Sequence, residues 1–220
     1  MSNRSRRGPG AGTSILPAGV VLAGGNSTRM GGREKTLLEI RGQTLLALVL
    51  DRLAPQVKET VINANGDPAR FGSFDLPVIG DDDDGRLGPL AGILAGMRWA
   101  RRLGYSHIVS VAGDTPFFPE TLVRNLAQAA ELQSASIALA ASRDRDGKLH
   151  LHPTFGLWNT GLMTDLEEAL QGGVRKILDW TDTHWTVPAE FPGVPTDPFF
   201  NINRPDDLDE AARMLEEQEG

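Results

Sequence analysis

The feature that most constrains the fold is a short apolar run that opens into a glycine-rich, basic stretch. The run Gly19–Ala23 is followed by Gly-Gly-Asn-Ser-Thr-Arg-Met-Gly-Gly-Arg-Glu and then by Lys35. A short apolar run bounded by glycines predicts a buried strand that ends in a loop. Glycines let backbone N–H groups face a ligand, and Arg29 and Lys35 can offset negative charge there. We therefore expect a phosphate-binding loop at this point of the chain.

This stretch matches neither of the two familiar phosphate-binding patterns. A Walker A loop requires Gly-Lys-Ser/Thr after a four-residue gap, and a dinucleotide-binding loop requires Gly-x-Gly-x-x-Gly; the sequence contains neither. The expectation of phosphate binding over a plain glycine-rich turn depends on the two glycine pairs and on three cations, Arg29, Arg33 and Lys35, directly after the first strand.

Strand and helix patterns alternate along the first two thirds of the chain. We expect strands at 19–23, 59–63, 77–80, 107–113, 136–141, 149–158, 183–187 and 199–203, helices beginning near 44, 89, 119, 159, 174 and 205, and irregular chain at 188–198. Alternation of this kind predicts an α/β fold: one three-layer, Rossmann-like domain whose mostly parallel sheet carries helices on both faces.

Composition and charge exclude several classes of protein. The chain has 220 residues and a net charge of −7, so it lacks the basic field of a nucleic-acid-binding protein. It has no cysteine, which excludes disulfides and thiolate ligands. No apolar run reaches the ~20 residues of a membrane span. Residues 1–18 are expected to be a disordered leader; Arg6-Arg7 precedes Gly-Pro-Gly-Ala-Gly and no apolar segment, so we do not expect export.

Polar side chains follow several predicted strands. Asn63, Asp81 and Asp114 each stand at or just beyond a strand end, and the carboxyl ends of parallel strands meet at one edge, where ligands bind. Asp114, after the apolar run 107–113, is the strongest candidate for a Mg²⁺ ligand beside a triphosphate. Asp81 is the other candidate, although either residue could instead cap a helix, and the run Asp81–Asp84 could be a solvated loop.

Polar residues in the second half of the chain are further candidates for a binding site. His152, in the sequence His-Pro-Thr, could be a functional group or a packed, hydrogen-bonded side chain. Asn201 and Asn203 would point to the same side of an extended strand, which suits polar ligand recognition, although asparagine also favours turns.

These blocks together resemble a known family. Leu-Ala-Gly-Gly at 22–25 with Arg29-Met30-Gly31 and Lys35, Gly-Pro-Leu-Ala-Gly at 88–92, Gly-Asp-Thr-Pro at 113–116, His-Pro-Thr at 152–154 and Asn-Ile-Asn-Arg-Pro at 201–205 follow the order found in molybdenum cofactor guanylyltransferases. The resemblance covers nearly the whole chain from Gly19. Leu-Ala-Gly-Gly, where the cytidylyl branch has Leu-Ala-Ala-Gly, resembles the guanylyl branch. The family carries a nucleotidyltransferase fold.

The resemblance implies roles for individual residues. GTP would be bound by Leu22, Ala23, Gly24, Lys35, Asn63, Asp81 and Asp114. Mg²⁺ would be held by Asp114, and Arg29, Lys35 and Asp114 would be catalytic. The acceptor, or the reacting phosphates, would be bound by Arg29, Gly32, Gly88, His152, Arg175, Asn201 and Asn203. Residues 19–141 would form the GTP- and Mg²⁺-binding half of a domain at 19–217, and 142–217 the acceptor-binding half. Some members carry Cys where this chain has Gly113.

The implied reaction is transfer of GMP from GTP to the terminal phosphate of molybdopterin, with release of diphosphate. The resemblance also implies a cytoplasmic enzyme that contacts proteins delivering molybdopterin or maturing molybdoenzymes, but neither nucleic acid nor membrane. Two alternatives remain open: a nucleotidyltransferase that uses CTP or another acceptor, such as a sugar phosphate, and a nucleotide-binding regulator without turnover. The combined presence of Arg29, Lys35 and Asp114 disfavours the regulator.

Overall fold

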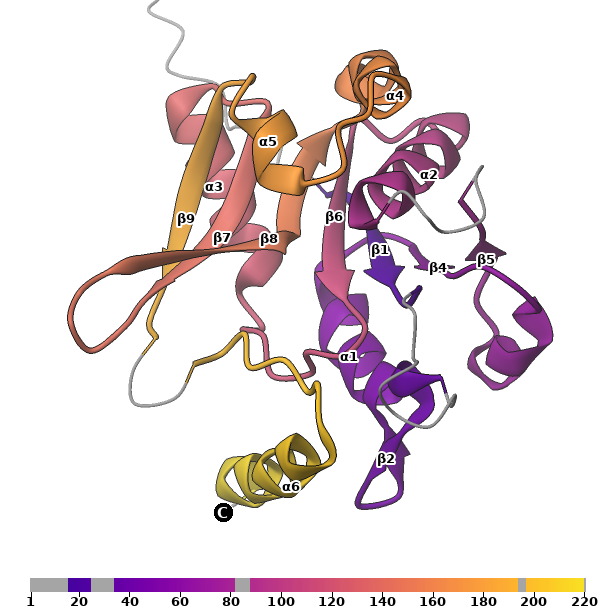
Figure 1. Cartoon of the computed structure of the whole chain (residues 1–220), viewed down its shortest axis with the longest axis vertical. Coiled ribbons are helices and arrows are strands. Elements are labelled where there is room, and N and C mark those ends of the chain that lie inside the picture. Colours follow the sequence, from indigo (N-terminus) through magenta and orange to yellow (C-terminus); the bar gives the residue numbers. More distant parts are fainter. Residues whose placement is uncertain (1–15, 25–33, 82–87, 194–196, 220) are drawn as a thin grey trace, which may run out of the picture.

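The structure is a computed structural model that describes residues 16–24, 34–81, 88–193 and 197–219. In this part of the chain the main sheet has the strand order β5-β4-β1-β6-β8-β7-β9 (Figure 1). Its strands are β1 (Ala18–Leu22), β4 (Thr60–Asn63), β5 (Val78–Ile79), β6 (His107–Ala112), β7 (Ile137–Arg143), β8 (Leu149–Asn159) and β9 (Thr186–Phe191). The first strand begins one residue before the domain start expected from the sequence.

Most of the sheet is parallel, as the alternating pattern predicts. Strands β5, β4, β1 and β6 pair in parallel, and β7 pairs in parallel with β9. Strand β8 is antiparallel to both of its neighbours, β6 and β7. The start of β8 therefore lies at the same edge as the carboxyl ends of β1, β4 and β6, which places the beginning of this strand beside the loops that follow them.

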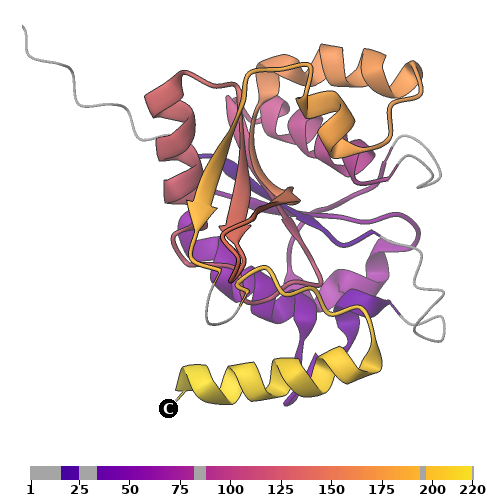
Figure 2. The same cartoon turned by 60° about the vertical axis from the view of Figure 1, so that its left-hand side comes forward.

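Helices cover both faces of the sheet, which confirms the three-layer α/β architecture (Figure 2). One face packs against α1 and α3, and the other against α2, α4 and α5. The helices are α1 (Leu45–Leu53), α2 (Pro89–Arg102), α3 (Leu122–Gln133), α4 (Met163–Gln171), α5 (Ile177–Thr181) and α6 (Pro205–Glu219). Short 3-10 helices lie at Lys35–Leu37, Ala54–Gln56, Pro68–Phe74 and Thr160–Leu162.

Local sequence explains where the helices begin. The hydroxyl of Thr44 accepts a hydrogen bond from the Ala47 amide (3.1 Å) and caps α1. Helix α2 has Pro89 in its first turn, where the missing amide proton costs no helical hydrogen bond. Helix α3 begins at Leu122, three residues later than the sequence suggests, because Pro119 forms a turn in which its carbonyl accepts from the Leu122 amide (2.9 Å).

Strand β8 contains a bulge at the His-Pro-Thr motif. Leu139 of β7 pairs with Gly156, but the next residue, Ala140, pairs with His152, so residues 153–155 have no partner in the ladder. Proline lacks the amide proton that a ladder position would use, so Pro153 suits such a bulge. A buried side chain anchors it: the Ser110 hydroxyl donates to the Thr154 carbonyl (2.7 Å).

Two expectations about the C-terminal third were wrong. Strand β9 spans Thr186–Phe191 and so includes Pro188, which we expected in irregular chain. Because β9 is the edge strand of the sheet, the missing amide proton of Pro188 leaves no central ladder bond unmade. Residues 199–203 are not a strand, because no neighbouring strand pairs with them in the described structure.

The chain ends in helix α6, which packs away from the main sheet, below α1 in Figure 2. It belongs to a separate apolar cluster: Ile40, Leu45, Phe117, Ile202, Ala211 and Met214. Ile40 lies in the two-stranded ribbon of β2 (Glu39–Ile40) and β3 (Gln43–Thr44) that follows Lys35. Helix α6 is thus packed against the chain segment just beyond the glycine-rich stretch.

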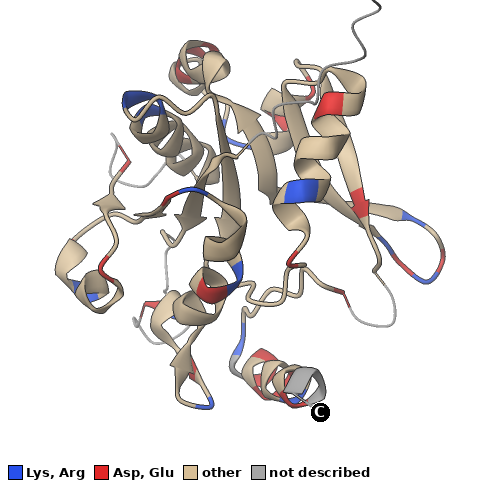
Figure 3. Cartoon of the chain, turned by 180° about the vertical axis from the view of Figure 1, so that it is seen from behind, with Lys and Arg blue, Asp and Glu red and all other residues tan. Residues whose placement is uncertain are grey.

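Charged residues lie mainly on helices and connections, and the strands carry few of them (Figure 3). Within the described ranges, no helix is long and apolar enough to cross a membrane.

Candidate active site

The strongest polar cluster joins Lys35 to three residues that are far away in the sequence. Its Nζ atom lies 2.5 Å from Oδ2 of Asp114, 2.7 Å from Oδ1 of Asn203 and 3.2 Å from Oδ1 of Asn201. An ammonium has three donors, and the three oxygens match them in number. The side chains of Lys35 and Asp114 are 17% and 21% exposed, so the ion pair is close to the surface and open to a ligand.

Backbone contacts explain why these four residues meet. Asp114 follows the central strand β6, and its carbonyl accepts a hydrogen bond from the Ile202 amide (3.0 Å). Ile202 is fully buried and anchors the extended segment that carries Asn201 and Asn203 on its two sides. The backbone N–H of Asn203 donates to Oδ2 of Asp207 (2.7 Å) in the first turn of α6. The two asparagine side chains therefore point the same way, as expected, although the segment is not a strand.

The carboxyl end of β1 lies next to this cluster. The Leu22 carbonyl accepts from the Gly113 amide (3.0 Å), and the Ala23 amide donates to the Asn63 carbonyl (2.9 Å). A Cβ added to Gly113 would lie 2.9 Å from Cγ2 of Thr36, which follows Lys35. A side chain at position 113 would therefore have to displace Thr36, so the absence of a side chain has a structural reason in this chain.

A second polar cluster surrounds Asp81, on the neighbouring strand ends. The carboxylate of Asp81 accepts from Nδ2 of Asn63 at Oδ1 and from Nδ2 of Asn65 at Oδ2, both at 2.9 Å. The Asp81 amide in turn donates to Oδ1 of Asn65 (2.7 Å). Asn63 is itself buried and Asp81 is half-buried. Gly24, at the end of β1, adjoins this cluster: a Cβ there would lie 3.9 Å from the Asn63 carbonyl oxygen.

His152 is held by a hydrogen bond and an aromatic stack. Its Nε2 lies 2.8 Å from the Ser142 hydroxyl, and its ring stacks on Phe199. Phe199 also contacts the rings of Phe155 and Phe191. Burial lowers the pKa of His152, the charge of nearby Asp197 opposes this shift, and that of His150 adds to it. These contacts match the interpretation of His152 as a packed, hydrogen-bonded residue.

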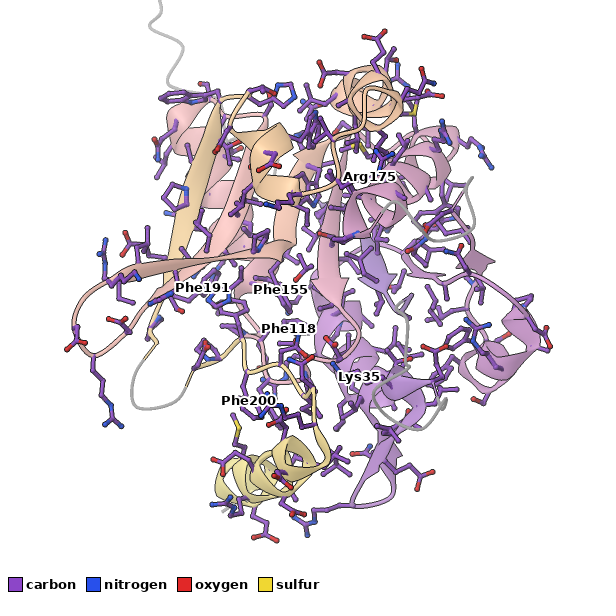
Figure 4. All side chains as sticks on the ribbon, in the orientation of Figure 1. Lys35, Phe118, Phe155, Arg175, Phe191 and Phe200 are labelled. Carbon is purple, nitrogen blue, oxygen red and sulfur yellow. The ribbon has the colours of Figure 1, made fainter. Side chains whose placement is uncertain are left out.

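The other predicted acceptor residues lie apart from Lys35. Gly88 and Arg175 are neighbours, since a Cβ on Gly88 would lie 3.6 Å from the Arg175 carbonyl oxygen. Gly88 has a φ of 71°, in the left-handed region that favours glycine. The Arg175 side chain is exposed and donates to the carbonyls of Leu170 (2.7 Å) and Val174 (2.8 Å). In Figure 4, Lys35 lies near the carboxyl end of β6 and Arg175 beside α2.

Several expected features fall outside the described residues: Arg29, Gly32 and Arg33 of the glycine-rich stretch, Asp82–Asp84 of the acidic run, and the leader up to residue 15. Among the described residues, no group of three or more His, Cys, Asp or Glu side chains could hold a metal ion. An oxygen-rich site with a single carboxylate, such as that around Asp114, is a different kind of site.

Sequence reasoning missed Asn65, because it opens the run Asn-Gly-Asp-Pro, which is typical of a turn. The available signal was its spacing: Asn63 and Asn65 are two residues apart in extended chain, as are Asn201 and Asn203, so both amides can face one ligand.

The sequence of this chain is similar to those of known proteins. The family model for the MobA-like NTP transferase domain matches residues 19–185. A molybdenum cofactor guanylyltransferase of Bradyrhizobium sp. (strain ORS 278) is 46% identical over 205 residues, 92% of this chain and 94% of the relative. One of Rhodopseudomonas palustris (strain BisB5) is 49% identical over 198 residues, 89% of this chain and 92% of the relative.

A solved structure is also similar along most of the chain. The crystal structure of molybdopterin-guanine dinucleotide biosynthesis protein A from Archaeoglobus fulgidus is 26% identical and superposes with a TM-score of 0.71, covering 91% of this chain and 99% of that one. A 4-diphosphocytidyl-2C-methyl-D-erythritol synthase at 16% identity and a TM-score of 0.68 shares the fold. The matched family model and the sequence relatives together show that this chain belongs to the MobA-like NTP transferase family.

Proposed function

We propose that the protein transfers GMP from GTP to the terminal phosphate of molybdopterin, releasing diphosphate and forming the molybdopterin guanine dinucleotide. The observation that carries this proposal is the meeting of Lys35 and Asp114 with Asn201 and Asn203 at one sheet edge. A cation and a carboxylate from residues 19–141 there meet two amides from residues 142–217. The names of the relatives supply the nucleotide and the acceptor.

The nucleotide is assigned to the edge formed by β1, β4 and β6. The backbone of Leu22, Ala23 and Gly24 would face the triphosphate, and Asn63 and Asp81 would face the base. Lys35 and Arg29 would offset the negative charge that accumulates on the phosphates during transfer. Lys35 is bound to Asp114, Asn201 and Asn203, so we expect it to exchange at least one of these contacts for a phosphate oxygen.

The residues around Asp114 fit a Mg²⁺ ion. One carboxylate and two amide oxygens are hard oxygen donors, and Mg²⁺ in nucleotide sites uses one or two carboxylates together with phosphates and water. Asp114 would hold the ion, with Asn201 and Asn203 beside it. When bound, Mg²⁺ supplies charge neutralisation of the triphosphate.

The bond changes of the proposed reaction need no general base in the protein. An oxygen of the molybdopterin phosphate forms a bond to the α-phosphorus of GTP, and the bond from that phosphorus to the bridging oxygen of the β-phosphate breaks. The diphosphate leaves with the electron pair of the broken bond. A phosphate monoester has a second pKa of ≈ 6 and is mostly ionised at neutral pH. The protein's task is then to position two anions in line and to offset their charge.

The acceptor is assigned to the half of the domain formed by residues 142–217. Because Asn201 and Asn203 bind Lys35, they would lie near the reacting phosphates. We propose His152, Gly88 and Arg175 for the rest of the acceptor site. The assignment of halves is supported by the bonds that Asn201 and Asn203 form with Lys35, which belongs to the other half. A cytoplasmic location and brief contacts with proteins that deliver or receive the pterin complete the proposal, since GTP and a labile cofactor intermediate are both handled there.

One assay tests the proposal. The protein is given molybdopterin, Mg²⁺ and each nucleoside triphosphate in turn, and diphosphate release is measured together with the formation of the dinucleotide. We expect turnover with GTP and with none of the other nucleoside triphosphates. Turnover with CTP and not GTP would instead support a cytidylyltransferase, and turnover of GTP only with a sugar phosphate would change the acceptor. Nucleotide binding with no turnover on either acceptor would support a regulator.

A further inference from the structure

We propose that Asn65 is a positioning residue for guanine recognition: it holds the carboxylate of Asp81 so that two of its acceptor positions remain for the base. This inference rests on the proposed function, in which Asp81 belongs to the nucleotide site. It adds a residue that makes guanine preferable to other bases without touching the nucleotide.

The contacts between Asn65 and Asp81 fix the orientation of that carboxylate. The amide of Asn65 binds residue 81 at two points, donating to Oδ2 (2.9 Å) and accepting from its backbone N–H (2.7 Å). Asn63 donates to the other oxygen, Oδ1, at 2.9 Å. Each oxygen of Asp81 is thus held by one amide, and the carboxylate cannot rotate without breaking both bonds.

Counting acceptor positions connects this arrangement with guanine. A carboxylate offers about four lone-pair positions. The two amides use one position on each oxygen, which leaves one on each oxygen among the contacts of the described residues. Guanine presents two adjacent donors, N1–H and the exocyclic N2–H₂, whereas adenine and cytosine place one donor beside a ring nitrogen that accepts. A fixed carboxylate with one position left on each oxygen therefore matches the two donors of guanine and repels the other two bases.

Asn65 is itself held in place by its neighbours. Nη2 of Arg70 donates to the Asn65 carbonyl (2.5 Å), and Nη1 of Arg70 donates to the Asp67 carbonyl (2.8 Å). Nε of Arg70 lies 3.2 Å from Oε2 of Glu34, the residue before Lys35. Since this chain of contacts runs from the loop end at Glu34 to Asp81, Asn65 is placed by the same elements that place the phosphate-binding lysine.

The test compares GTP with ITP, whose base keeps N1–H and lacks the N2 amine. We expect the wild-type protein to prefer GTP over ITP by about tenfold or more in kcat/KM, because the analogue leaves one acceptor of a charged group unpaired. The Asn65→Ala variant should lose most of this preference, with a larger fall for GTP than for ITP. A binding measurement with the same two nucleotides and no acceptor should show the same change in ratio.

Two further variants complete the design. Asn159→Ala is the matched control, because Asn159 makes a similar local bond to the Gly161 amide (2.8 Å) at the opposite end of the sheet; it should leave the ratio unchanged. Asn65→Asp keeps the size of the side chain, replaces the donor with a second carboxylate, and should also lower the ratio. It decides the question if Asn65→Ala does not fold.

The inference would be overturned if a folded Asn65 variant kept the wild-type ratio of kcat/KM for GTP to that for ITP. It would also be overturned if the wild-type protein itself had a ratio near one. Failure of the proposed function has a different signature: the wild-type protein would turn over CTP or no nucleotide at all.

Discussion

The imidazole ring of His152 stacks on the phenyl ring of Phe199, with 4.2 Å between the ring centroids and 25° between the ring planes. His152 lies beside the bulge of β8, and Phe199 stands two residues before Asn201. The stack therefore connects the His-Pro-Thr motif to the segment whose amides bind Lys35. A residue of the sheet edge thus helps to hold the part of the site that lacks secondary structure.

The stability of the protein should fall as the pH drops below about 6.5. Burial lowers the pKa of His152 and of His107 in the folded state from the ordinary value of 6.5. Above that pH both rings are neutral in folded and unfolded chains alike; below it the unfolded chain takes up protons first, and stability is lost until the folded pKa is reached. Urea titrations between pH 7.5 and 5 measure this loss.

The variant His152→Phe keeps an aromatic ring on Phe199 and removes one titrating group. Its urea midpoint should depend less on pH than that of the wild type, whatever its absolute stability. If the urea midpoint of the variant changed with pH as steeply as that of the wild type, His152 would not contribute to the loss of stability at low pH.

Replacing Asp114 or Lys35 should affect different steps of the proposed reaction. We expect Asp114→Ala to lower kcat by about 10²–10³-fold, because charge stabilisation in the transition state is lost. Lys35→Ala should also weaken GTP binding, since the ammonium would meet the phosphates. Steady-state diphosphate release and nucleotide titration measure the two effects, with the exposed Lys58→Ala as control. Near-normal turnover of Asp114→Ala would remove the metal assignment.

A side chain at Gly92, in the first turn of α2, should destabilise the protein. A Cβ there would clash with Oδ1 of Asn63 and would lie 2.8 Å from Cδ2 of Leu22. We expect Gly92→Ala to lower the free energy of unfolding by about 1–3 kcal/mol and to weaken GTP binding by displacing Asn63. Gly72→Ala is the matched control, because a Cβ at Gly72 would meet nothing within 4 Å. Equal melting temperatures for the two variants would contradict the prediction.

The bulge of β8 should depend on Ser110. Its buried hydroxyl donates to the Thr154 carbonyl and accepts from Nε1 of Trp158 (2.9 Å). The variant Ser110→Ala leaves both groups without their partner, and each buried unpaired group costs about 1–3 kcal/mol. Thermal unfolding should show that the free energy of unfolding falls by at least about 1–3 kcal/mol. A variant as stable as the wild type would mean that the bulge is held by other contacts.

The sequence was sufficient to predict the parallel strands of the sheet and the residues at one edge of the site. Short apolar runs identify β1, β4 and β6; the first leads into glycines and the other two into Asn63 and Asp114, so these two residues could be assigned to one edge from the sequence. The meeting of Lys35 with Asn201 and Asn203 could not be derived in this way, because it depends on the Ile202 amide binding the Asp114 carbonyl, a contact between residues 88 positions apart in the chain.

The errors have physical causes. Pro188 indicated irregular chain, yet an edge strand accommodates proline because one side of it has no partner. The alternation at 199–203 suggested a strand, yet the buried residues Phe199 and Ile202 pack into two different apolar clusters, with Phe199 against the sheet and Ile202 against α6. Asn65 looked like a turn residue because nothing in the local sequence shows that Asp81 lies opposite it.

The packing of α6 against Ile40 and Leu45 has a consequence for the order of synthesis. A ribosome makes Lys35 and Asp114 early, and all strands of the described sheet are complete once Phe191 has been added. The oxygens of Asn201 and Asn203 are made later, and α6, which packs on the ribbon after Lys35, follows them. A nascent chain halted after β9 would thus carry a finished sheet but lack the two amides that bind Lys35, so the candidate site can form only after the sheet is complete.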